Sequence, residues 1–236
     1  MHTLKLLEKK ELAEGTMAFY FGKPASFSYL PGQYAFFSIG EKGLFKKKLV
    51  RHFTLITIPS EDRLGFATRM RAESDFKNKL KAMPIGSPVD ISEPLGSFIL
   101  PESAGAPLVF LAGGIGITPG YSMLQSAAAA GSAQEITLFY SNRNPKATAF
   151  LAELKGLASD KIKIVATMTD DGLSLAEWDG ERGRISPELI KKYVASWPEA
   201  LYYMSGPLEM VKAMKKMLTE MGIKSAQIKI ETFTGY

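Results

Sequence analysis

The sequence predicts a chain in two parts, a small β-barrel followed by an α/β region with a parallel sheet. Three observations support this prediction. The length of 236 residues suits two domains of ordinary size better than one core. Up to about Leu100, short apolar segments alternate with turn residues, as in a barrel. Beyond Pro107, nearly continuous apolar segments alternate with helical patterns, which indicates βαβ units. We therefore expect domains over residues 1–102 and 103–236.

The first part contains five segments that we expect to be strands, each bounded by Gly, Pro, Ser or charged residues. One helix interrupts them, within "ESDFKNKLKAM", where Phe76, Leu80 and Met83 share a face at spacings of four and three residues. The expected strands lie within "GTMAFYFG", "QYAFFSIG", "RHFTLITIP", "LGFATRMR" and "SPVDISEP".

The second part alternates strands with helices. Apolar runs such as "LVFLAG" are typical of a parallel sheet that is buried on both faces. The other expected strands lie within "EITLFYS", "KIKIVATMT", "ALYYMSG" and "QIKIETF". We expect helices over residues 118–130, 146–157, 187–195 and 208–221.

Composition narrows the chemistry. The chain has no cysteine, which excludes disulfides, thiolate-bound iron–sulfur clusters, Cys-type zinc sites and a cysteine nucleophile. Redox chemistry would therefore need a bound organic cofactor, and no metal site is expected. The net charge is +5 with a pI near 9.2, and positive residues cluster in "KGLFKKKLVR" and "TRMRAESDFKNKLK". Such runs fit a solvated face or a docking surface for an acidic protein, while nothing in them indicates nucleic-acid binding.

No segment reaches the ~18 uninterrupted apolar residues of a membrane span. The first residues, "MHTLKLLEKKEL", carry charges where a signal peptide has its apolar stretch. We expect a cytoplasmic protein.

A glycine-rich segment, "VFLAGGIGITPGYSML", joins the first strand of the second part to the next helix. Gly113, Gly114 and Gly116 permit a tight turn and close backbone approach, and the helix that follows presents free N–H groups and a positive dipole. A plain turn would use glycines in the same way. The position on the first strand of a parallel sheet favours a phosphate-binding turn instead.

Two other strands of this sheet end in residues that suit a ligand. The fourth strand ends in Ser205, Gly206 and Pro207 and is followed directly by a helix. The second strand ends in Ser141, Asn142 and Arg143, which could hold a ribose or its phosphate, although a surface loop would look similar. Because ligands of parallel sheets bind beyond the carboxyl ends of the strands, these ends are expected to converge.

The segments "RHFTL", "GGIGITP" and "SGP", followed by an aromatic tail, occur in the order found in the ferredoxin–NADP reductase superfamily, and together they resemble that family. The resemblance implies an antiparallel Greek-key flavin-binding barrel followed by a Rossmann-like pyridine-nucleotide domain, without an iron–sulfur domain. It also implies FAD, with FMN less favoured, and NADPH or NADH as the cosubstrate.

The family's Arg–x–Tyr–Ser/Thr strand is matched by Arg51, Phe53 and Thr54. An Arg can pair with flavin phosphate, an aromatic ring can stack on the flavin, and the Thr54 hydroxyl can bond near flavin N5. Ser74 stands where the family has a Gly-rich turn at a helix start, but no glycine accompanies it, which weakens the prediction for the adenylate half of FAD. The flavin residues implied by the resemblance are Arg51, His52, Phe53, Thr54, Thr68, Ser74, Phe233 and Tyr236.

The family's nucleotide motifs are matched by two sets of residues. Ser205 replaces the cysteine of a Cys–Gly–Pro motif, and Glu231 and Phe233 match a Glu–x–aromatic tail that could instead be a frayed edge strand. Thr54, Ser205 and Glu231 are the catalytic candidates. The nucleotide-binding candidates are Gly113, Gly114, Gly116, Ile117, Thr118, Pro119, Ser141, Asn142, Arg143, Gly206 and Pro207.

The resemblance implies a flavin-dependent oxidoreductase that passes electrons between NAD(P)H and a one-electron acceptor such as ferredoxin or flavodoxin, through hydride transfer to flavin N5. The alternatives are an NAD(P)H-dependent free-flavin or ferric reductase and an electron-relay subunit of a larger redox complex. Arg143 and Ser141 favour a modest preference for NADPH. The expected docking face for the acidic carrier comprises Lys46, Lys47, Lys48, Arg69, Arg71, Lys77 and Lys79.

Overall fold

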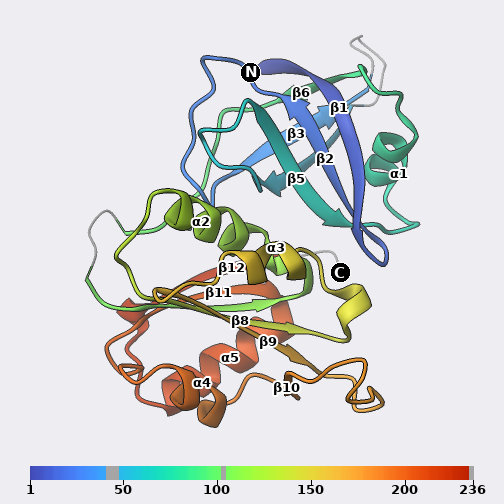
Figure 1. Ribbon diagram of the computed structural model, residues 1–236. Helices are drawn as coiled ribbons and strands as arrows, with labels where there is room; N and C mark the ends of the chain where they lie inside the picture. The colour runs from blue at the N-terminus through green and yellow to red at the C-terminus, as the bar shows by residue number, and fades with distance from the viewer. Residues whose placement is uncertain (41–47, 102–104, 234–236) are drawn as a thin grey trace.

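The computed structural model describes residues 1–40, 48–101 and 105–233, and it contains two six-stranded sheets (Figure 1). The first sheet is antiparallel and barrel-like, with the strand order β4-β3-β6-β1-β2-β5. The Ile56 amide, two residues after the edge strand β4, donates a hydrogen bond of 2.8 Å to the Gly65 carbonyl in the other edge strand, β5. Its elements are β1 (His2–Ala13), β2 (Thr16–Gly22), β3 (Tyr34–Ile39), β4 (Leu49–Thr54), β5 (Arg63–Arg69), α1 (Asp75–Ala82) and β6 (Pro88–Ile91).

The second sheet is parallel throughout, with the order β10-β9-β8-β7-β11-β12. Helices α2 and α3 lie on the side of the first sheet, and α4 and α5 cover the opposite face (Figure 1). The predicted fold class is therefore confirmed. The strands are β7 (Leu108–Gly113), β8 (Ile136–Asn142), β9 (Ile162–Met168), β10 (Glu181–Arg182), β11 (Leu201–Pro207) and β12 (Ile228–Phe233). The helices are α2 (Ile117–Ala129), α3 (Leu151–Gly156), α4 (Pro187–Tyr193) and α5 (Leu208–Glu220), with short 3₁₀ turns η1 (Gly114–Gly116), η2 (Pro145–Ala147) and η3 (Ser225–Gln227).

The structure corrects two of the expected elements. Strand β1 was not predicted, because charged residues interrupt its apolar pattern and only Leu4 and Leu6 are fully buried. The helix expected over residues 146–157 is broken into η2 and α3, since Phe150 adopts a left-handed φ of 60°. The Phe150 ring stacks on Tyr121 of α2 at 4.0 Å, so a tertiary contact offsets the cost of that backbone conformation.

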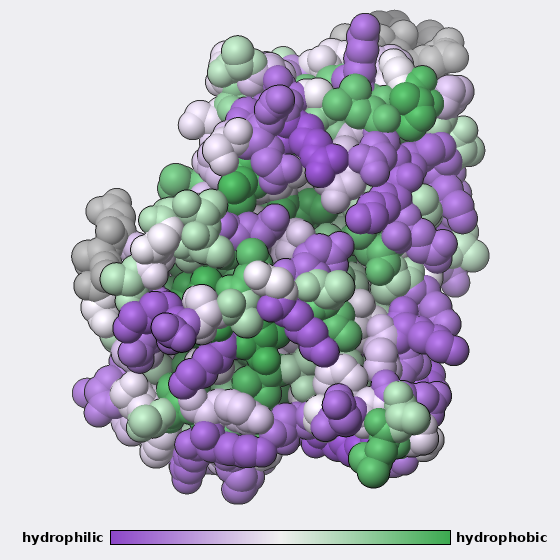
Figure 2. Space-filling model, viewed as in Figure 1, coloured by the Kyte–Doolittle hydropathy of each residue, from purple (hydrophilic) through white to green (hydrophobic). Residues whose placement is uncertain are grey.

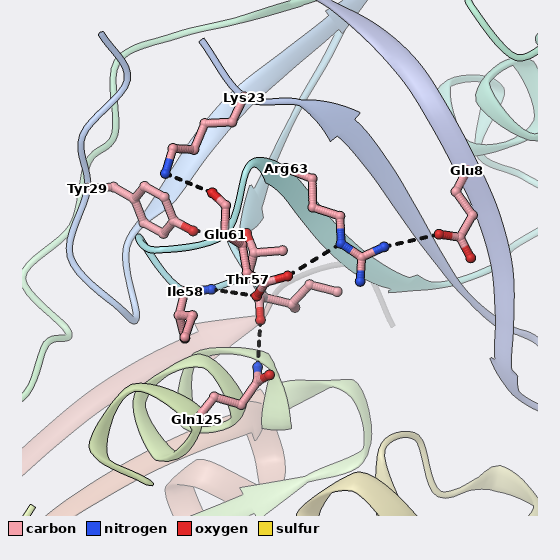
Figure 3. Close-up of polar contacts among 9 residues, drawn as sticks. Glu8, Lys23, Tyr29, Thr57, Ile58, Glu61, Arg63 and Gln125 are labelled. Carbon is pink, nitrogen blue, oxygen red and sulfur yellow. Dashed lines mark hydrogen bonds and ion pairs between the residues drawn. The ribbon is translucent and has the colours of Figure 1, made fainter. Parts of the chain in front are cut away.

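Two hydrogen bonds, one buried and one partly buried, connect loops of the first sheet to α2. The Gly32 amide donates to the Ser122 hydroxyl at 3.0 Å, and the Gln125 side-chain amide donates to the Ile56 carbonyl at 2.9 Å (Figure 3). The loop after β4 is held in turn by Glu61, whose carboxylate accepts from the Ile58 amide at 3.0 Å and from Arg63 at 3.3 Å. These bonds fix the end of β4 next to the glycine turn at the start of α2.

Within the part of the chain that the structure describes, no helix has the length and apolar character needed to cross a bilayer.

Candidate functional site

A cavity of about 420 Å³ lies where the first sheet meets the glycine turn of the second. Residues from the edge strand β4, from β5, from the start of α1, from the turn before α2 and from β12 form its walls. It brings together the predicted flavin residues of the described ranges, whereas Tyr236 lies outside them. The lining residues are Arg51, His52, Phe53, Thr54, Ala67, Thr68, Arg69, Arg71, Glu73, Ser74, Lys77, Ile115, Thr118 and Phe233.

Strand β4 presents an aromatic ring and a hydroxyl at this cavity. The Phe53 ring stacks on Phe66 at 4.0 Å with the planes 2° apart, and Phe66 is buried in the barrel core. Phe66 therefore holds the ring in one orientation while Phe53 also lines the cavity. Thr54 is buried at the end of the strand. The two residues offer a flat apolar surface next to a hydrogen-bonding group.

The lining of the cavity is also rich in cations, three of which were predicted to belong to a docking face. Arg69, Arg71 and Lys77 line the cavity together with Arg51. Burial, followed by the nearby charges of Arg71 and Arg51, lowers the pKa of Lys77. A cavity wall with this charge suits an anionic ligand such as a phosphate. The run of positive charges in the sequence indicated a binding surface. The sequence did not indicate that several of these side chains line the cavity.

The two glycine-tipped strand ends converge, as predicted. A Cβ atom on Gly116 would lie 2.5 Å from the Gly206 Cα and 2.7 Å from the Ser205 carbonyl oxygen. Gly116 therefore allows the turn after β7 to contact the end of β11 backbone to backbone. Ile117 and Pro119 are buried in the first turn of α2, and Thr118, which donates to the Ile115 carbonyl at 3.1 Å, reaches the cavity wall.

Replacing Gly116 with Ala is expected to destabilise the protein by about 1–3 kcal/mol, because backbone atoms must move to admit the Cβ. Chemical denaturation of the purified variant measures this loss. Gly156→Ala is the matched control, since its Cβ would meet nothing within 4 Å. Equal stabilities for the two variants would contradict the close approach.

Ser205 and Glu231 lie side by side on the neighbouring strands β11 and β12. Ser205 is buried, and Oε2 of Glu231 is buried without a hydrogen-bond partner among the described residues. Burial raises the pKa of Glu231 to about 7. Because side chains two residues apart share a face of a strand, Glu231 lies on the same side of β12 as Phe233, which lines the cavity. The carboxyl can therefore exchange a proton near neutral pH beside the cavity.

The end of β8 does not bring its three candidates together. Ser141 lines a second cavity of about 410 Å³, whose polar rim includes Thr169, Arg184 and Glu209. Asn142 is buried on the other face of the sheet, and its side-chain nitrogen has no partner in the described parts of the chain. Arg143 is exposed, with its Nε atom 4.0 Å from an Asp170 carboxylate oxygen. Asp170 was not predicted as a site residue. It follows β9, and it lies near Arg143 because β8 and β9 are neighbours in the sheet.

Comparisons with known proteins agree with this architecture. Residues 110–216 match the family model of the oxidoreductase NAD-binding domain. Flavohemoprotein A of Dictyostelium discoideum is 27% identical over 95% of this chain and 58% of its own length. The ferredoxin reductase component of 3-ketosteroid-9-alpha-monooxygenase from Mycobacterium tuberculosis is 26% identical over 89% of this chain and 56% of its own length. The chain thus spans about half the length of the curated relatives it matches.

Among solved structures, a ferredoxin NADP⁺ reductase from Neisseria gonorrhoeae with bound FAD and NADP superimposes with a TM-score of 0.82. It is 22% identical, and the match covers 98% of both chains. The two-sheet fold of the chain is therefore similar to that of this reductase, and residues 110–216 are similar to oxidoreductase NAD-binding domains.

Proposed function

We propose that this chain is an NAD(P)H-dependent flavin oxidoreductase that binds FAD in the cavity at β4, with a barrel domain over residues 1–102 and a nucleotide domain over residues 103–236. One observation carries the proposal. A single cavity unites the β4 residues Arg51 to Thr54 with Thr118 of the glycine turn and Phe233 of the last strand. These segments are far apart in the sequence, and sequence motifs alone indicate each of them as a flavin-binding or nucleotide-binding segment.

The cavity has the chemistry that a flavin needs. The Arg51 guanidinium can pair with a phosphate, and Phe53, supported by Phe66, offers a flat surface for the ring system. The Thr54 hydroxyl, which belongs to the same cavity wall, would offer a hydrogen bond to a polar edge of that ring. When bound, the flavin supplies the group that accepts a hydride from the nicotinamide and passes electrons on singly. Phe233 lines the same cavity, so its ring would lie beside the bound flavin.

The glycine turn, Gly206 and Pro207 would position the nucleotide, while Ser205 and Glu231 would contact the nicotinamide. A Glu231 carboxylate can accept a hydrogen bond from the carboxamide N–H groups of the nicotinamide. Ser141 and its cavity suit the adenosine end.

The proposal is tested by purifying the full chain, identifying any bound flavin from its absorbance and after release, and mixing the protein anaerobically with NADPH or NADH. We expect bound FAD whose absorbance bleaches on mixing with either nucleotide. Protein that arrives without flavin but reduces added FMN or FAD would indicate the free-flavin reductase instead. A failure to bleach with either nucleotide would contradict both.

Nucleotide preference is expected to depend on Arg143 and Asp170. Arg143 favours the 2′-phosphate of NADPH, but the Asp170 carboxylate beside it opposes that charge, so the preference for NADPH over NADH is expected to be small. Asp170→Asn should raise the ratio of kcat/KM for NADPH to that for NADH about fivefold, and Arg143→Ala should lower it, as for exposed charge pairs worth up to about 1 kcal/mol. Steady-state kinetics at constant ionic strength gives these ratios.

Asp171→Asn serves as the control for nucleotide preference, because this neighbouring residue is exposed and forms no ion pair among the described residues. A preference of the unmodified protein for NADH would refute the expected order. If Asp170→Asn and Asp171→Asn have the same effect, Asp170 has no specific role.

We propose an acidic electron carrier, such as a ferredoxin or flavodoxin, as the acceptor. The similarity to the ferredoxin reductase component of 3-ketosteroid-9-alpha-monooxygenase supports this class of partner. Lys46 and Lys47 of the expected docking face lie outside the described residues, Lys48 pairs with Asp90 at 3.1 Å, and Lys79 is exposed on α1. Hydrophilic side chains cover the surface around α1 (Figure 2).

Electron transfer to an acidic ferredoxin should fall steeply as salt is raised, because added ions screen the attraction between the two proteins. Changing Lys46, Lys47 and Lys48 together to Gln should flatten that dependence and leave flavin reduction by NADPH unchanged. Stopped-flow measurements at several ionic strengths decide the point. A rate to ferredoxin that responds to neither salt nor the triple change would place the acceptor elsewhere.

A further inference from the structure

The turn between β5 and α1 presents side chains to the cavity. It contains no glycine, and three hydrogen bonds hold it in place. The Ser74 amide donates to the Arg71 carbonyl at 3.1 Å, the Asn78 side-chain amide donates to the Ala72 carbonyl at 2.6 Å, and the Lys77 amide donates to the Ser74 hydroxyl at 3.4 Å. These bonds hold the backbone that carries Arg71 and Lys77 in place without a ligand.

The cations of the cavity come from two parts of its lining, which are called its two walls below. Arg51 belongs to β4, whereas Arg71 and Lys77 belong to the turn and to α1. None of the three forms an ion pair with another described residue, although the exposed carboxylate of Glu73 also lines the cavity. Lys77 is partly buried, and its ammonium donates to the Arg69 carbonyl at 2.8 Å.

These cations repel one another in the free protein. Burial is the largest cause of the lowered pKa of Lys77, and the positive charges of Arg71 and Arg51 add to it. An anion placed between the two walls would relieve this repulsion and restore the favourable interactions that burial removed. A ligand with two linked phosphates can meet both walls at once, whereas a single phosphate held by Arg51 need not reach the second wall.

We propose that Arg71 and Lys77 bind the adenosine-bearing phosphate of FAD, while Arg51 binds the phosphate on the ribityl chain. The chain thereby selects FAD over FMN with side chains instead of the backbone of a glycine turn. This inference rests on the proposed function, because it assumes that the flavin occupies the cavity at β4.

The test compares the affinities of FAD and FMN for the full chain after its flavin has been removed, using the change in flavin fluorescence on binding. Arg71→Ala and Lys77→Gln should each raise the dissociation constant of FAD about tenfold or more and change that of FMN less than about twofold. Gln retains a donor for the Arg69 carbonyl, so the turn should keep its shape. Lys79→Gln is the matched control, since Lys79 is an exposed lysine of the same helix that does not line the cavity.

Each outcome bears on the proposal. Loss of FAD affinity with FMN affinity preserved supports it. Equal losses for FAD and FMN overturn it, because the cations then serve a phosphate that both flavins carry. Unchanged FAD affinity in both variants, or a loss equal to that of Lys79→Gln, also overturns it. A starting protein that binds neither flavin contradicts the proposed function itself, and thermal unfolding of each variant shows whether the fold is intact.

Discussion

The Arg51→Ala variant is expected to lose its flavin during purification. The arginine lines the cavity on β4 and forms no ion pair with another described residue, so its charge is available to a ligand phosphate. Loss of a hydrogen bond between charged groups costs about 1.5–3 kcal/mol, which corresponds to a roughly 10- to 150-fold weaker dissociation constant. The ratio of flavin absorbance to protein absorbance after purification measures occupancy, and titration of the flavin-free chain measures affinity.

Arg51→Lys is the matched variant for this experiment. It keeps the positive charge and loses the two-pronged geometry of the guanidinium. Its affinity for flavin should therefore lie between those of the unmodified protein and Arg51→Ala. FAD and FMN should both bind more weakly to Arg51→Ala, because both carry the phosphate assigned to Arg51. Full occupancy and unchanged affinity in Arg51→Ala would show that β4 does not hold the flavin phosphate.

The second large effect concerns the pH dependence caused by Glu231. Burial raises the pKa of this carboxyl from 4.5 to about 7, so the unfolded chain releases the proton at a lower pH than the folded chain. The contribution of Glu231 to the free energy of unfolding is therefore most favourable at low pH and is lost as the pH rises from about 4.5 to about 7. Glu231→Gln removes this ionisation and should gain up to about 3 kcal/mol relative to the unmodified protein at pH 8, with little gain at pH 4.

The same residue should control flavin reduction. An ionised Glu231 accepts a stronger hydrogen bond from the nicotinamide carboxamide than a protonated one, so the rate of reduction by NADPH should rise with pH through about 7. Glu231→Gln should be slower and independent of pH in this range. Chemical denaturation and anaerobic stopped-flow mixing, each from pH 5 to pH 8, provide the two readouts. A variant that keeps both pH profiles of the unmodified protein would exclude Glu231 as the titrating group.

The sequence predicted the elements whose signal is local. Phe76 and Leu80, four residues apart, are the buried residues of α1. The apolar run from Leu108 to Gly113 forms a fully buried strand of a parallel sheet. Strand β1 was missed because charged residues on its outer side interrupt the alternation of buried and exposed residues. The helix expected over residues 146–157 was too long, because stacking on Tyr121 stabilises Phe150 in a left-handed conformation that breaks the helix.

Among the candidate site residues, too, those with a local sequence signal were predicted and those that depend on tertiary contacts were not. The sequence indicated Arg51, Phe53 and Thr54 through a short motif within one strand, and the structure places all three on the cavity wall. It assigned Arg71 and Lys77 to an exterior face because a run of charges carries no information about direction. Asp170 and Arg143 are 27 residues apart, and only the adjacency of β8 and β9 brings them within 4.0 Å.

By itself the sequence determined most of the strands and helices, the two-part architecture, the glycine-tipped strand ends and the absence of cysteine chemistry, since these depend on residue type and spacing along the chain. The tertiary structure alone decided which charges share a cavity, which carboxyl is buried without a partner, and why Gly116 needs to be glycine. The physical reason is that pKa shifts, steric contact and electrostatic repulsion depend on distances through space, and those distances arise only when the two sheets pack together.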